Sequence, residues 1–338
     1  MIEKYIQQSS LDESPLVRTI TGDCMANMCK DIFELIDGRH QMLALTLMLP
    51  LPMDDDANVK AAGCRALGVF ILFPSVRQNP YFVSDIITAV LEQMMDKSLL
   101  VRVRASWAQG NLCDAMVLQR TSEEFCFPEW ISVGVWRSIM TTATNASMDN
   151  DKLRSNAVRA MGSLLQITPK EYFADGRNMQ LIKSAMGELI KNMETGALKT
   201  RWNACHAASN LLKNEDYPIG YMSDGGMYQW TEGFYHALVH SLNSCKNFKV
   251  RINSCLALAT PTKREFYGDQ RLFNKTVEGV LKAWDACQDG AETEFQEYRY
   301  REQLKHQLMI TLRHLKDWMS KEDLDRTHKI LNESTTIE

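Results

Sequence analysis

One short segment recurs six times along the sequence, and this repetition constrains the fold more than any other feature. Each copy carries one basic residue near its start, which we call the anchor. The six anchors are Arg18, Lys60, Arg102, Arg154, Arg201 and Arg251. Successive anchors are 42, 42, 52, 47 and 50 residues apart. These intervals lie at or slightly above the unit length of about 40–47 residues that is typical of repeats built from two or three helices.

The residues around each anchor have the pattern of a closely packed helix. The residue before the anchor is apolar in five of the six copies, and the residues six and eight positions after it are small in all six. Small residues on the packed stripe of a helix let a neighbouring helix approach closely. A second amphipathic pattern precedes this helix, as in residues 81–95 and 179–193, with Pro80 and Pro169 where helices can begin. Each unit is therefore predicted to be a helical hairpin, and no alternating pattern predicts a sheet.

We therefore expect an all-α fold, a right-handed α-α superhelix of the HEAT/armadillo solenoid type with about six to seven helical hairpins. The whole chain, residues 1–338, is expected to form a single HEAT-repeat solenoid. Its repeats are expected around residues 1–30, 31–75, 79–118, 129–167, 178–213 and 229–262. An atypical C-terminal cap at 270–331 and a disordered tail at 332–338 should follow.

Composition and charge disfavour several other classes of protein. With 45% hydrophobic and 24% charged residues, the chain can bury a large core. The formal net charge of −4 provides no overall positive field, so nucleic-acid binding is disfavoured, although a local basic strip remains open. The first residues lack the pattern of a signal peptide, and the apolar stretch 41–53 contains two prolines and is too short to span a membrane. Nine isolated cysteines without a CxxC pair indicate reduced thiols. We expect an intracellular protein, cytoplasmic and/or nuclear.

Acidic residues stand shortly before four of the anchors. They are Asp12, Asp56, Asp96 and Asp151. We expect these acids to pair with the anchors of successive units and to fix their register through charge-assisted hydrogen bonds. The anchors are therefore interpreted as structural residues rather than as ligand-binding residues.

Five strings in the repeats resemble one particular family. They are AAGCRALGVFILFPSVRQ, DKSLLVRVRASWAQGNLCD, LRSNAVRAMGSLL, TRWNACHAASNLLKN and CKNFKVRINSCLALATPTKREFYG. In this order and spacing they look like the C-terminal HEAT-repeat region of the HEAT repeat-containing protein 6 family, and the resemblance covers roughly residues 55–300. It implies a HEAT-repeat fold and a protein-binding role, with no catalytic or cofactor residues to carry over. Because members of that family are longer at the amino end, it also implies a short relative or a C-terminal portion.

A polar ridge is predicted on the second helix of each unit, opposite the packed stripe. Positions two, five and nine after the anchor collect Arg65, Arg104, Trp107, Asn111, Asn156, Arg159, Asn203, His206, Asn210 and Asn253. One interpretation is a concave groove whose amides and guanidinium groups bind an extended acidic or polar partner segment. The other is a hydrogen-bond ladder between repeats, which the regular recurrence favours. Trp107 and Trp202 could similarly line a peptide pocket or pack against the adjacent hairpin.

Two further clusters contain residue types that could bind a ligand. Lys246 and Lys249 lie in the basic string CKNFKVR, which could contact a phosphate or an acidic peptide or could be a solvated helix start. His236 and His240 are spaced i, i+4, with Glu232 one turn earlier. The string HALVH lacks the glutamate of HExxH and no third strong ligand is evident, so no metal site is expected.

The sequence thus favours a non-catalytic scaffold that binds other proteins. The candidate partner-binding residues are Arg65, Arg104, Asn111, Asn156, Arg159, Asn203, His206, Asn210, Asn253, Lys246 and Lys249. No P-loop, dinucleotide-binding fingerprint, GxSxG elbow or kinase motif occurs, so no enzyme activity, cofactor or small-molecule substrate is expected. The alternative is a nuclear transport adaptor or a nucleic-acid-associated solenoid, because such proteins use the same helical hairpins.

Overall fold

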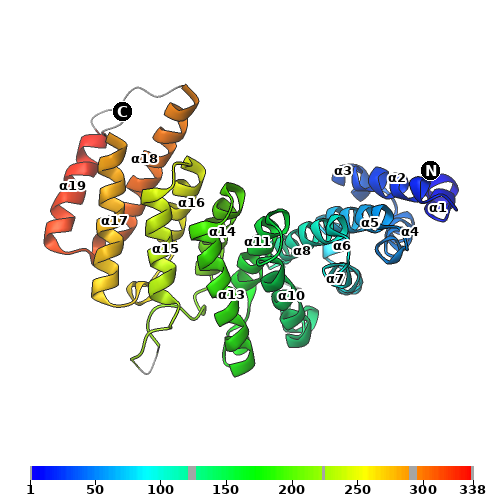
Figure 1. Cartoon of the computed structure of the whole chain (residues 1–338), viewed down its shortest axis with the longest axis horizontal. Helices are drawn as coiled ribbons and strands as arrows, with labels where there is room; N and C mark the ends of the chain where they lie inside the picture. The colour runs from blue at the N-terminus through cyan, green and yellow to red at the C-terminus, as the bar shows by residue number, and fades with distance from the viewer. Residues whose placement is uncertain (1, 121–126, 223–224, 289–294, 336–338) are drawn as a thin grey trace. The chain divides into compact units, whose positions relative to one another are not determined.

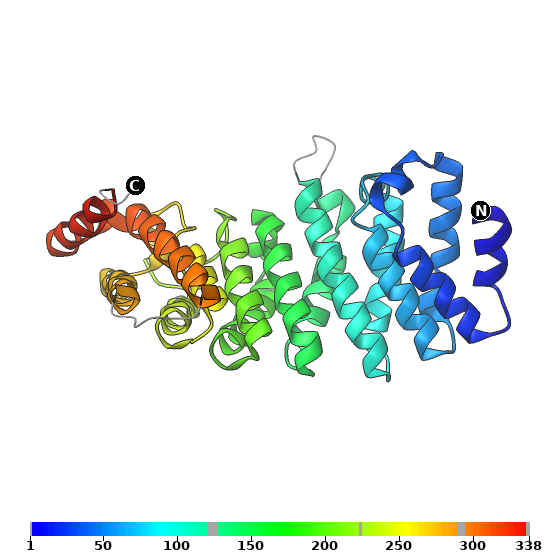
Figure 2. The ribbon, with the colours of Figure 1, turned by 90° about the horizontal axis from the view of Figure 1, so that it is seen from above.

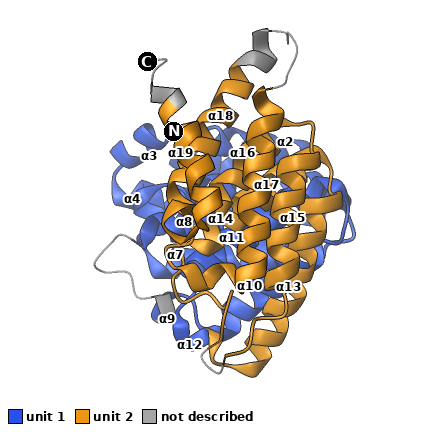
Figure 3. Cartoon of the chain, turned by 90° about the vertical axis from the view of Figure 1, so that its left-hand side faces the viewer, with its two compact units in different colours: residues 1–172 blue, residues 173–338 orange. Residues whose placement is uncertain are grey.

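The computed structural model describes residues 2–120, 127–222, 225–288 and 295–335. Within these ranges the chain is helical and contains no β-strand, apart from one isolated bridge between Tyr221 and Met227 (Figure 1). The chain divides into two compact units, Met1–Tyr172 and Phe173–Glu338 (Figure 3). The expected all-α fold of helical hairpins is confirmed.

The first unit contains four second helices that carry the anchors. They are α2 (Pro15–Ala26), α5 (Ala57–Phe70), α8 (Leu99–Gln119) and α11 (Asp151–Ile167). Each packs on the next one along the chain, as the blue to green ribbons of Figure 2 show. The helices that precede or connect them are η1 (Ile2–Ile6), α1 (Gln7–Ser10), α3 (Lys30–Leu35), α4 (Gly38–Met48), η2 (Leu51–Met53), α6 (Pro74–Arg77), α7 (Pro80–Gln93), α9 (Phe127–Trp130) and α10 (Val133–Ala146).

The second unit continues the same alternation of first and second helices. Its hairpins are α13 (Gly176–Thr195) with α14 (Leu198–Leu212), α15 (Thr231–Ser244) with α16 (Phe248–Leu258), and α17 (Gln270–Gln288) with α18 (Phe295–Leu315). Short helices α12 (Lys170–Phe173), η3 (Arg264–Tyr267) and η4 (Lys316–Trp318) connect elements, and α19 (Lys321–Thr335) packs on α17 and α18. The disordered tail expected from residue 332 is wrong for 332–335, because α19 continues through them; residues 336–338 lie outside the described ranges.

The small residues eight positions after the anchors set how closely the second helices pack. A Cβ atom added to Gly68 of α5 would lie 2.9 Å from both the Cα and the Cβ of Ala108 on α8. Real Cβ atoms essentially never approach other heavy atoms this closely. The glycine is therefore required for the packing of α5 on α8, as the sequence pattern indicates.

The arginine anchors cap the end of the preceding segment in their own unit. Arg201 donates from Nε to the Met193 carbonyl oxygen at 2.9 Å, and Arg251 donates in the same way to the Leu242 carbonyl at 2.8 Å. Carbonyl groups at the C-terminus of a helix have no partner within the helix. Each anchor therefore satisfies backbone groups where the chain turns from the first helix into the second.

A seventh anchor is present in addition to the six that the sequence pattern shows. Arg301 of α18 donates from Nε to the Cys287 carbonyl oxygen at 3.1 Å, at the end of α17. It follows Arg251 by 50 residues. The α17–α18 hairpin therefore repeats the anchor contact of the earlier units.

In the first unit, three anchors also pair with an aspartate of the next repeat. Arg18 contacts Asp54 at 2.7 Å, Lys60 contacts Asp96 at 2.8 Å and Arg102 contacts Asp149 at 3.0 Å. The expected pairing between successive units is confirmed for Asp96 but wrong for Asp56 and Asp151. Asp54 and Asp149 contact the anchors of the preceding repeats instead, and Asp151 contacts Arg154 of its own repeat at 3.4 Å. Asp12 is also not paired by its carboxylate with an anchor. Its Oδ1 accepts from Ser14 N–H at 2.9 Å, while its carbonyl oxygen accepts from Arg18.

The choice of aspartate follows from helix capping. Asp56 is the N-cap of α5, and its Oδ1 accepts from Asn58 and Val59 N–H groups. Asp54, two residues earlier, accepts from the Asp56 N–H on Oδ1 at 2.9 Å and still has Oδ2 to accept from Arg18 Nε at 2.7 Å. The N-cap carboxylate is committed to the new helix, so the anchor binds the carboxylate before it.

These ion pairs should make the stability of the first unit depend on pH. The hydrogen bond from Arg18 lowers the pKa of Asp54. Burial opposes ionisation of Asp96 and Asp149, but hydrogen bonds from Lys60 and Arg102 keep the pKa of each below its usual value. A carboxyl group whose pKa is lower in the folded than in the unfolded state stabilises the fold fully above its unfolded-state pKa of about 4. This stabilisation is lost as the pH falls through the folded-state pKa.

We expect the triple substitution of Asp54, Asp96 and Asp149 by Asn to lower the free energy of unfolding at pH 7 by about 1–3 kcal/mol. The difference from the unsubstituted chain should shrink below pH 4, where the carboxylates of that chain become protonated. Asparagine keeps the oxygen that accepts from the backbone N–H, but it removes both the charge and the second oxygen, which accepts from the anchor. Urea unfolding at pH 7 and pH 3 measures the effect, with Asp85→Asn as control, because Asp85 is exposed and makes no ion pair within the described residues. A difference that stays constant with pH would contradict the role of these charges.

Candidate interaction surface on the second helices

In the first unit, several residues of the predicted ridge form contacts between repeats. Asn111 is buried, and its Nδ2 donates to the Gly68 carbonyl oxygen of the preceding second helix at 2.8 Å. Its Oδ1 accepts from Arg159 of the following helix at 2.9 Å. Asn111 therefore connects three successive second helices, and its amide is committed to the packing of the repeats.

Arg159 lies across the preceding helix rather than pointing into solvent. Its guanidinium donates to Asp114 at 3.1 Å and to the Trp107 carbonyl oxygen at 3.2 Å, in addition to Asn111. A Cβ atom on Gly110 would come well within contact distance of this guanidinium. Gly110 thus leaves the space that Arg159 fills, which assigns Arg159 to the contact between α8 and α11.

The remaining ridge residues of the first unit differ in exposure. Arg65 is half-buried and donates to Asp23 of α2 and to Asn27, the C-cap of α2, at 2.9 Å each. Asn156 is buried, whereas Arg104 is exposed and forms no ion pair within the described residues. The ladder between repeats therefore uses Arg65, Asn111 and Arg159 and leaves Arg104 at the surface.

In the second unit, the ridge residues are more accessible. His206 is exposed, Asn203 and Asn253 are half-buried, and Asn210 is buried. Asn210 accepts from Lys213 at 3.0 Å, and Asn253 donates to the Lys249 carbonyl oxygen of its own helix at 2.8 Å. These contacts lie within single helices, in contrast to those between helices in the first unit.

Lys249 and two aromatic rings form a cluster across three second helices. Its ammonium nitrogen lies 5.4 Å from the ring centre of Trp202 on α14 and 5.7 Å from that of Tyr300 on α18. Such distances are within the range of a cation–π interaction. Trp202 is 37% exposed, and Lys249 and the nearby Lys246 are also exposed. We call Trp202, Lys249 and Tyr300 the aromatic–lysine cluster.

The sequence patterns did not identify Tyr300 as part of this cluster. It stands directly before the seventh anchor, Arg301, and the preceding residue of most other anchors is aliphatic. Recognising Arg301 as an anchor would have placed Tyr300 on the helix next to α16. The signal was therefore present but depended on finding the seventh repeat.

The charges of α14 and α16 have one sign. Lys199, Arg201, Lys249 and Arg251 lie in these helices, which contain no aspartate or glutamate. Arg201 and Arg251 are committed to backbone carbonyls as anchors, while Lys199 and Lys249 are exposed. The accessible face of these two helices therefore combines positive charge with aromatic surface.

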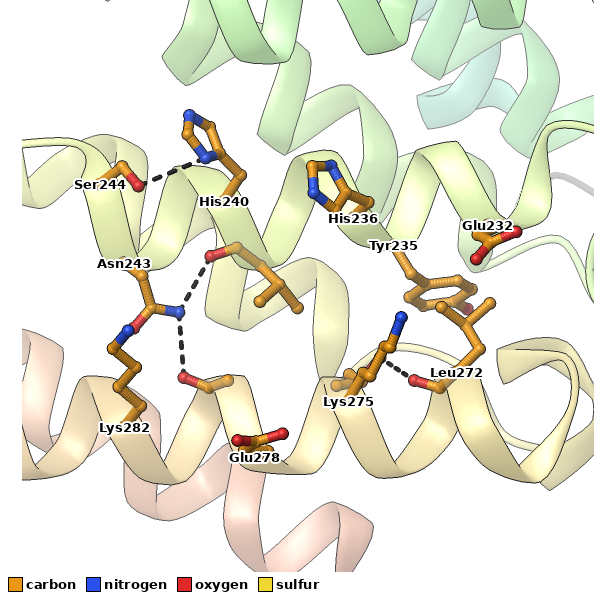
Figure 4. A pocket seen from close by; sticks show the side chains of 13 residues that line it. Glu232, Tyr235, His236, His240, Asn243, Ser244, Leu272, Lys275, Glu278 and Lys282 are labelled. Carbon is orange, nitrogen blue, oxygen red and sulfur yellow. Dashed lines mark hydrogen bonds between the residues drawn. The ribbon is translucent and has the colours of Figure 1, made fainter.

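His236 and His240, the candidate metal ligands, lie beside a cavity between α15 and α17. The cavity has a volume of about 310 Å³, and Figure 4 shows His236 and His240 on α15 with Lys275, Glu278 and Lys282 on α17. Each histidine has a polar neighbour: Nδ1 of His236 lies 3.5 Å from a Glu194 carboxylate oxygen, and Nδ1 of His240 lies 3.3 Å from the Ser244 hydroxyl. In the described ranges, no three His, Cys, Asp or Glu side chains are grouped to hold a metal ion.

Most thiols of the chain are packing groups. The cysteines outside residues 121–126 are all free, and six of them are buried. Burial raises the pKa of Cys64 to about 12 and that of Cys205 to about 11. A protonated thiol is a poor nucleophile, so these two cysteines are suited to packing rather than to covalent chemistry.

Comparison with known proteins places the fold but not a specific family. No protein-family model matches the chain. An uncharacterized protein of Dictyostelium discoideum is 24% identical over 409 aligned residues, which cover 90% of this chain and 26% of that protein. The chain thus spans about a quarter of the length of this curated relative. Within the described residues, no helix is both long and apolar enough to cross a membrane.

Solved structures with a similar fold include designed repeat proteins. One designed armadillo repeat protein has a TM-score of 0.51 at 16% identity, covering 75% of this chain and 98% of its own. Another, solved in complex with the peptide (KR)4, has a TM-score of 0.51 at 15% identity and covers 77% and 98%. These likenesses confirm the expected HEAT/armadillo-type helical-repeat fold.

Proposed function

We propose that this chain is a non-catalytic scaffold that binds segments of other proteins along the exposed surface of its second helices. The observation that carries the proposal is the face of α14 and α16, where exposed lysines and the aromatic–lysine cluster occur without a carboxylate in either helix. A surface of this kind attracts an extended segment with acidic and apolar side chains. Among the predicted partner-binding residues, the accessible candidates are Arg104, Asn203, His206, Asn253, Lys246 and Lys249.

The fold supports a binding function because repeat proteins present extended surfaces built from successive units. The designed armadillo protein solved with (KR)4 contains a basic peptide. The helices α14 and α16 have cations and no acids, so they would repel a basic peptide of this kind. We therefore infer a preference for acidic or polar segments rather than basic ones.

Lys249→Glu tests this proposal. It places a negative charge next to Trp202 and Tyr300 at an exposed position, so it should weaken binding of acidic partners at least tenfold without unfolding the chain. Partners that co-purify stoichiometrically with the unsubstituted chain from cells are identified by mass spectrometry and then titrated with each purified variant. Lys183→Glu, at an exposed position of α13, is the matched control. Partners retained equally by both variants would contradict this location.

The alternative function, a nuclear transport adaptor or a nucleic-acid-associated solenoid, draws on the same positive face. Binding of a nucleic acid would weaken steeply with salt, because cations that contact phosphates release counterions. A titration of a single-stranded oligonucleotide at two salt concentrations separates the two functions. Weak binding with little salt dependence would leave the protein scaffold as the proposed function.

The identity and organisation of the chain are proposed on narrower grounds. We infer membership of the HEAT repeat-containing protein 6 family from the five strings, which fall on or around α5, α8, α11, α14 and α16 in the same order. First and second helices alternate in the described part of both units, which supports a single solenoid over residues 1–338 with its repeats as predicted. The free cysteines support an intracellular, cytoplasmic and/or nuclear location.

A further inference from the structure

In the first unit, every turn into a second helix exposes one large apolar side chain. The residues are Leu11, Met53, Met95 and Met148, which are 75%, 43%, 72% and 48% exposed. Each stands directly before an aspartate, namely Asp12, Asp54, Asp96 or Asp149. We call the four apolar residues the methionine edge.

Adjacent turns of the methionine edge are joined by direct contacts. Arg102 donates to the Asp96 carbonyl oxygen at 3.0 Å and contacts the Asp149 carboxylate, so it links the turns that carry Met95 and Met148. These two methionines line one cavity of about 460 Å³. Gln93, near Met95, donates to the sulfur of Met53 at 3.4 Å. The exposed side chains therefore form a continuous row.

Folding does not require an apolar residue at this position. Leu11, Met53 and Met95 stand seven residues before their anchors, and Met148 stands six residues before Arg154. In the second unit, the residues seven positions before Arg201 and Arg251 are Glu194 and Ser244. Exposed methionines contribute little to a core, whereas their flexible, polarizable side chains suit an adaptable binding surface. A periodic row of them is better explained by contact with a partner.

The charges around the row indicate the chemistry of that partner. The four turn segments, 11–14, 53–56, 95–98 and 148–151, contain eight acidic residues and one lysine. The anchors neutralise Asp54, Asp96 and Asp149. Asp151 is exposed but also contacts its anchor Arg154, at 3.4 Å. Asp12, Glu13 and Asp55 are exposed and make no ion pair within the described residues, so the edge is apolar at its centre and negative at its margins.

The spacing of the turns matches a helix laid along the edge. Packed helices lie about 8–10 Å apart, and residues i and i+7 of a helix are separated by about 10.5 Å. One apolar residue in every second turn of a bound helix could therefore meet each methionine in succession. We propose that the methionine edge binds an amphipathic helix of a partner protein whose apolar stripe is flanked by lysine and arginine.

The test uses a synthetic amphipathic peptide with leucine on one helical face and lysine on the rest, titrated into the full chain by fluorescence anisotropy. The triple variant Met53→Ser, Met95→Ser, Met148→Ser should weaken binding at least tenfold. Met42→Ser, at a residue of α4 that is 55% exposed, should change it less than twofold. Because all four side chains are exposed, circular dichroism and the melting temperature should stay close to those of the unsubstituted chain.

Three outcomes would overturn the proposal. They are no binding of the peptide, equal binding by the triple variant, and equal binding of a peptide in which glutamate replaces every lysine. Self-association of the chain that the triple variant abolishes would assign the edge to a second copy instead. Asp55→Lys should weaken peptide binding, because it reverses an exposed charge beside Met53.

This proposal does not rest on the proposed function of α14 and α16. Lys249→Glu lies in the second unit and should leave binding of the basic peptide unchanged. Conversely, the triple methionine variant should retain partners that depend on Lys249. Failure of one surface would therefore leave the other intact.

Discussion

Gly220→Ala is expected to destabilise the second unit by about 3–5 kcal/mol, because it adds two separate penalties. Gly220 has a φ of +77°, a conformation that residues with a side chain rarely adopt. A Cβ atom there would also collide with the backbone carbonyl oxygen of Glu265, which belongs to the neighbouring segment that contains η3. Backbone atoms cannot rotate away from such a contact as a flexible side chain can.

The predicted loss should spread from Gly220 into the segment around it. Its N–H donates to the Thr231 hydroxyl at 3.0 Å, and Tyr221 N–H donates to the Glu265 carbonyl oxygen at 3.2 Å. Peptide-resolved hydrogen exchange should show faster exchange in residues 217–231 and 264–268, and the urea midpoint of the full chain should fall. The same exchange pattern in both proteins would contradict the role assigned to Gly220.

Gly225→Ala is the matched control for Gly220→Ala. Gly225 also has a positive φ, of +87°, but a Cβ atom there would meet nothing within 4 Å. It should therefore show only the backbone cost of about 1–2 kcal/mol. The difference between the two variants measures the collision with Glu265, independently of backbone strain.

The segment around Gly220 also shows what sequence patterns can and cannot predict. Its richness in Gly, Asp and Tyr predicts a loop on one edge, and the described part is a loop. No pattern indicates that Tyr217 and Trp230 are buried or that Trp230 donates to the Pro218 carbonyl oxygen at 2.9 Å. Tyr217 packs on Phe173, at 5.8 Å between ring centres, and the loop meets η3 through the Tyr221 N–H bond to the Glu265 carbonyl oxygen. Both partners lie about one repeat away in the sequence. Local composition does not indicate a contact between segments so far apart in the sequence.

The residues of the predicted ridge differ in role: some contact a neighbouring helix, and others lie at the surface. Helical periodicity places Arg104 and Arg159 on one face, yet Arg104 is exposed while Arg159 crosses α8. The difference depends on Gly110, which leaves room for a guanidinium, and on Asp114, which receives it. Periodicity assigns a side to each residue, but the partner on the neighbouring helix decides whether a long side chain reaches solvent.

The small-residue pattern of the repeats leads to a second prediction with a large effect on stability. Gly68→Leu is expected to destabilise the first unit by about 2–4 kcal/mol, because its Cβ alone would lie 2.9 Å from the Cα of Ala108 and from the ring of Trp107. Leucine favours helix by about 0.8 kcal/mol relative to glycine. The collision should outweigh this gain, since α5 and α8 must separate and the Asn111 bond to the Gly68 carbonyl oxygen must lengthen.

Gly187→Leu on α13 isolates the two effects, because a Cβ atom there would meet nothing within 4 Å. With no collision, only the helix preference remains, and this variant should be more stable than the unsubstituted chain by about 0.5–1 kcal/mol. Urea unfolding followed by circular dichroism should therefore move in opposite directions for the two leucines. A similar shift for both would mean that glycine at the eighth position after the anchor is not required for close packing of the second helices.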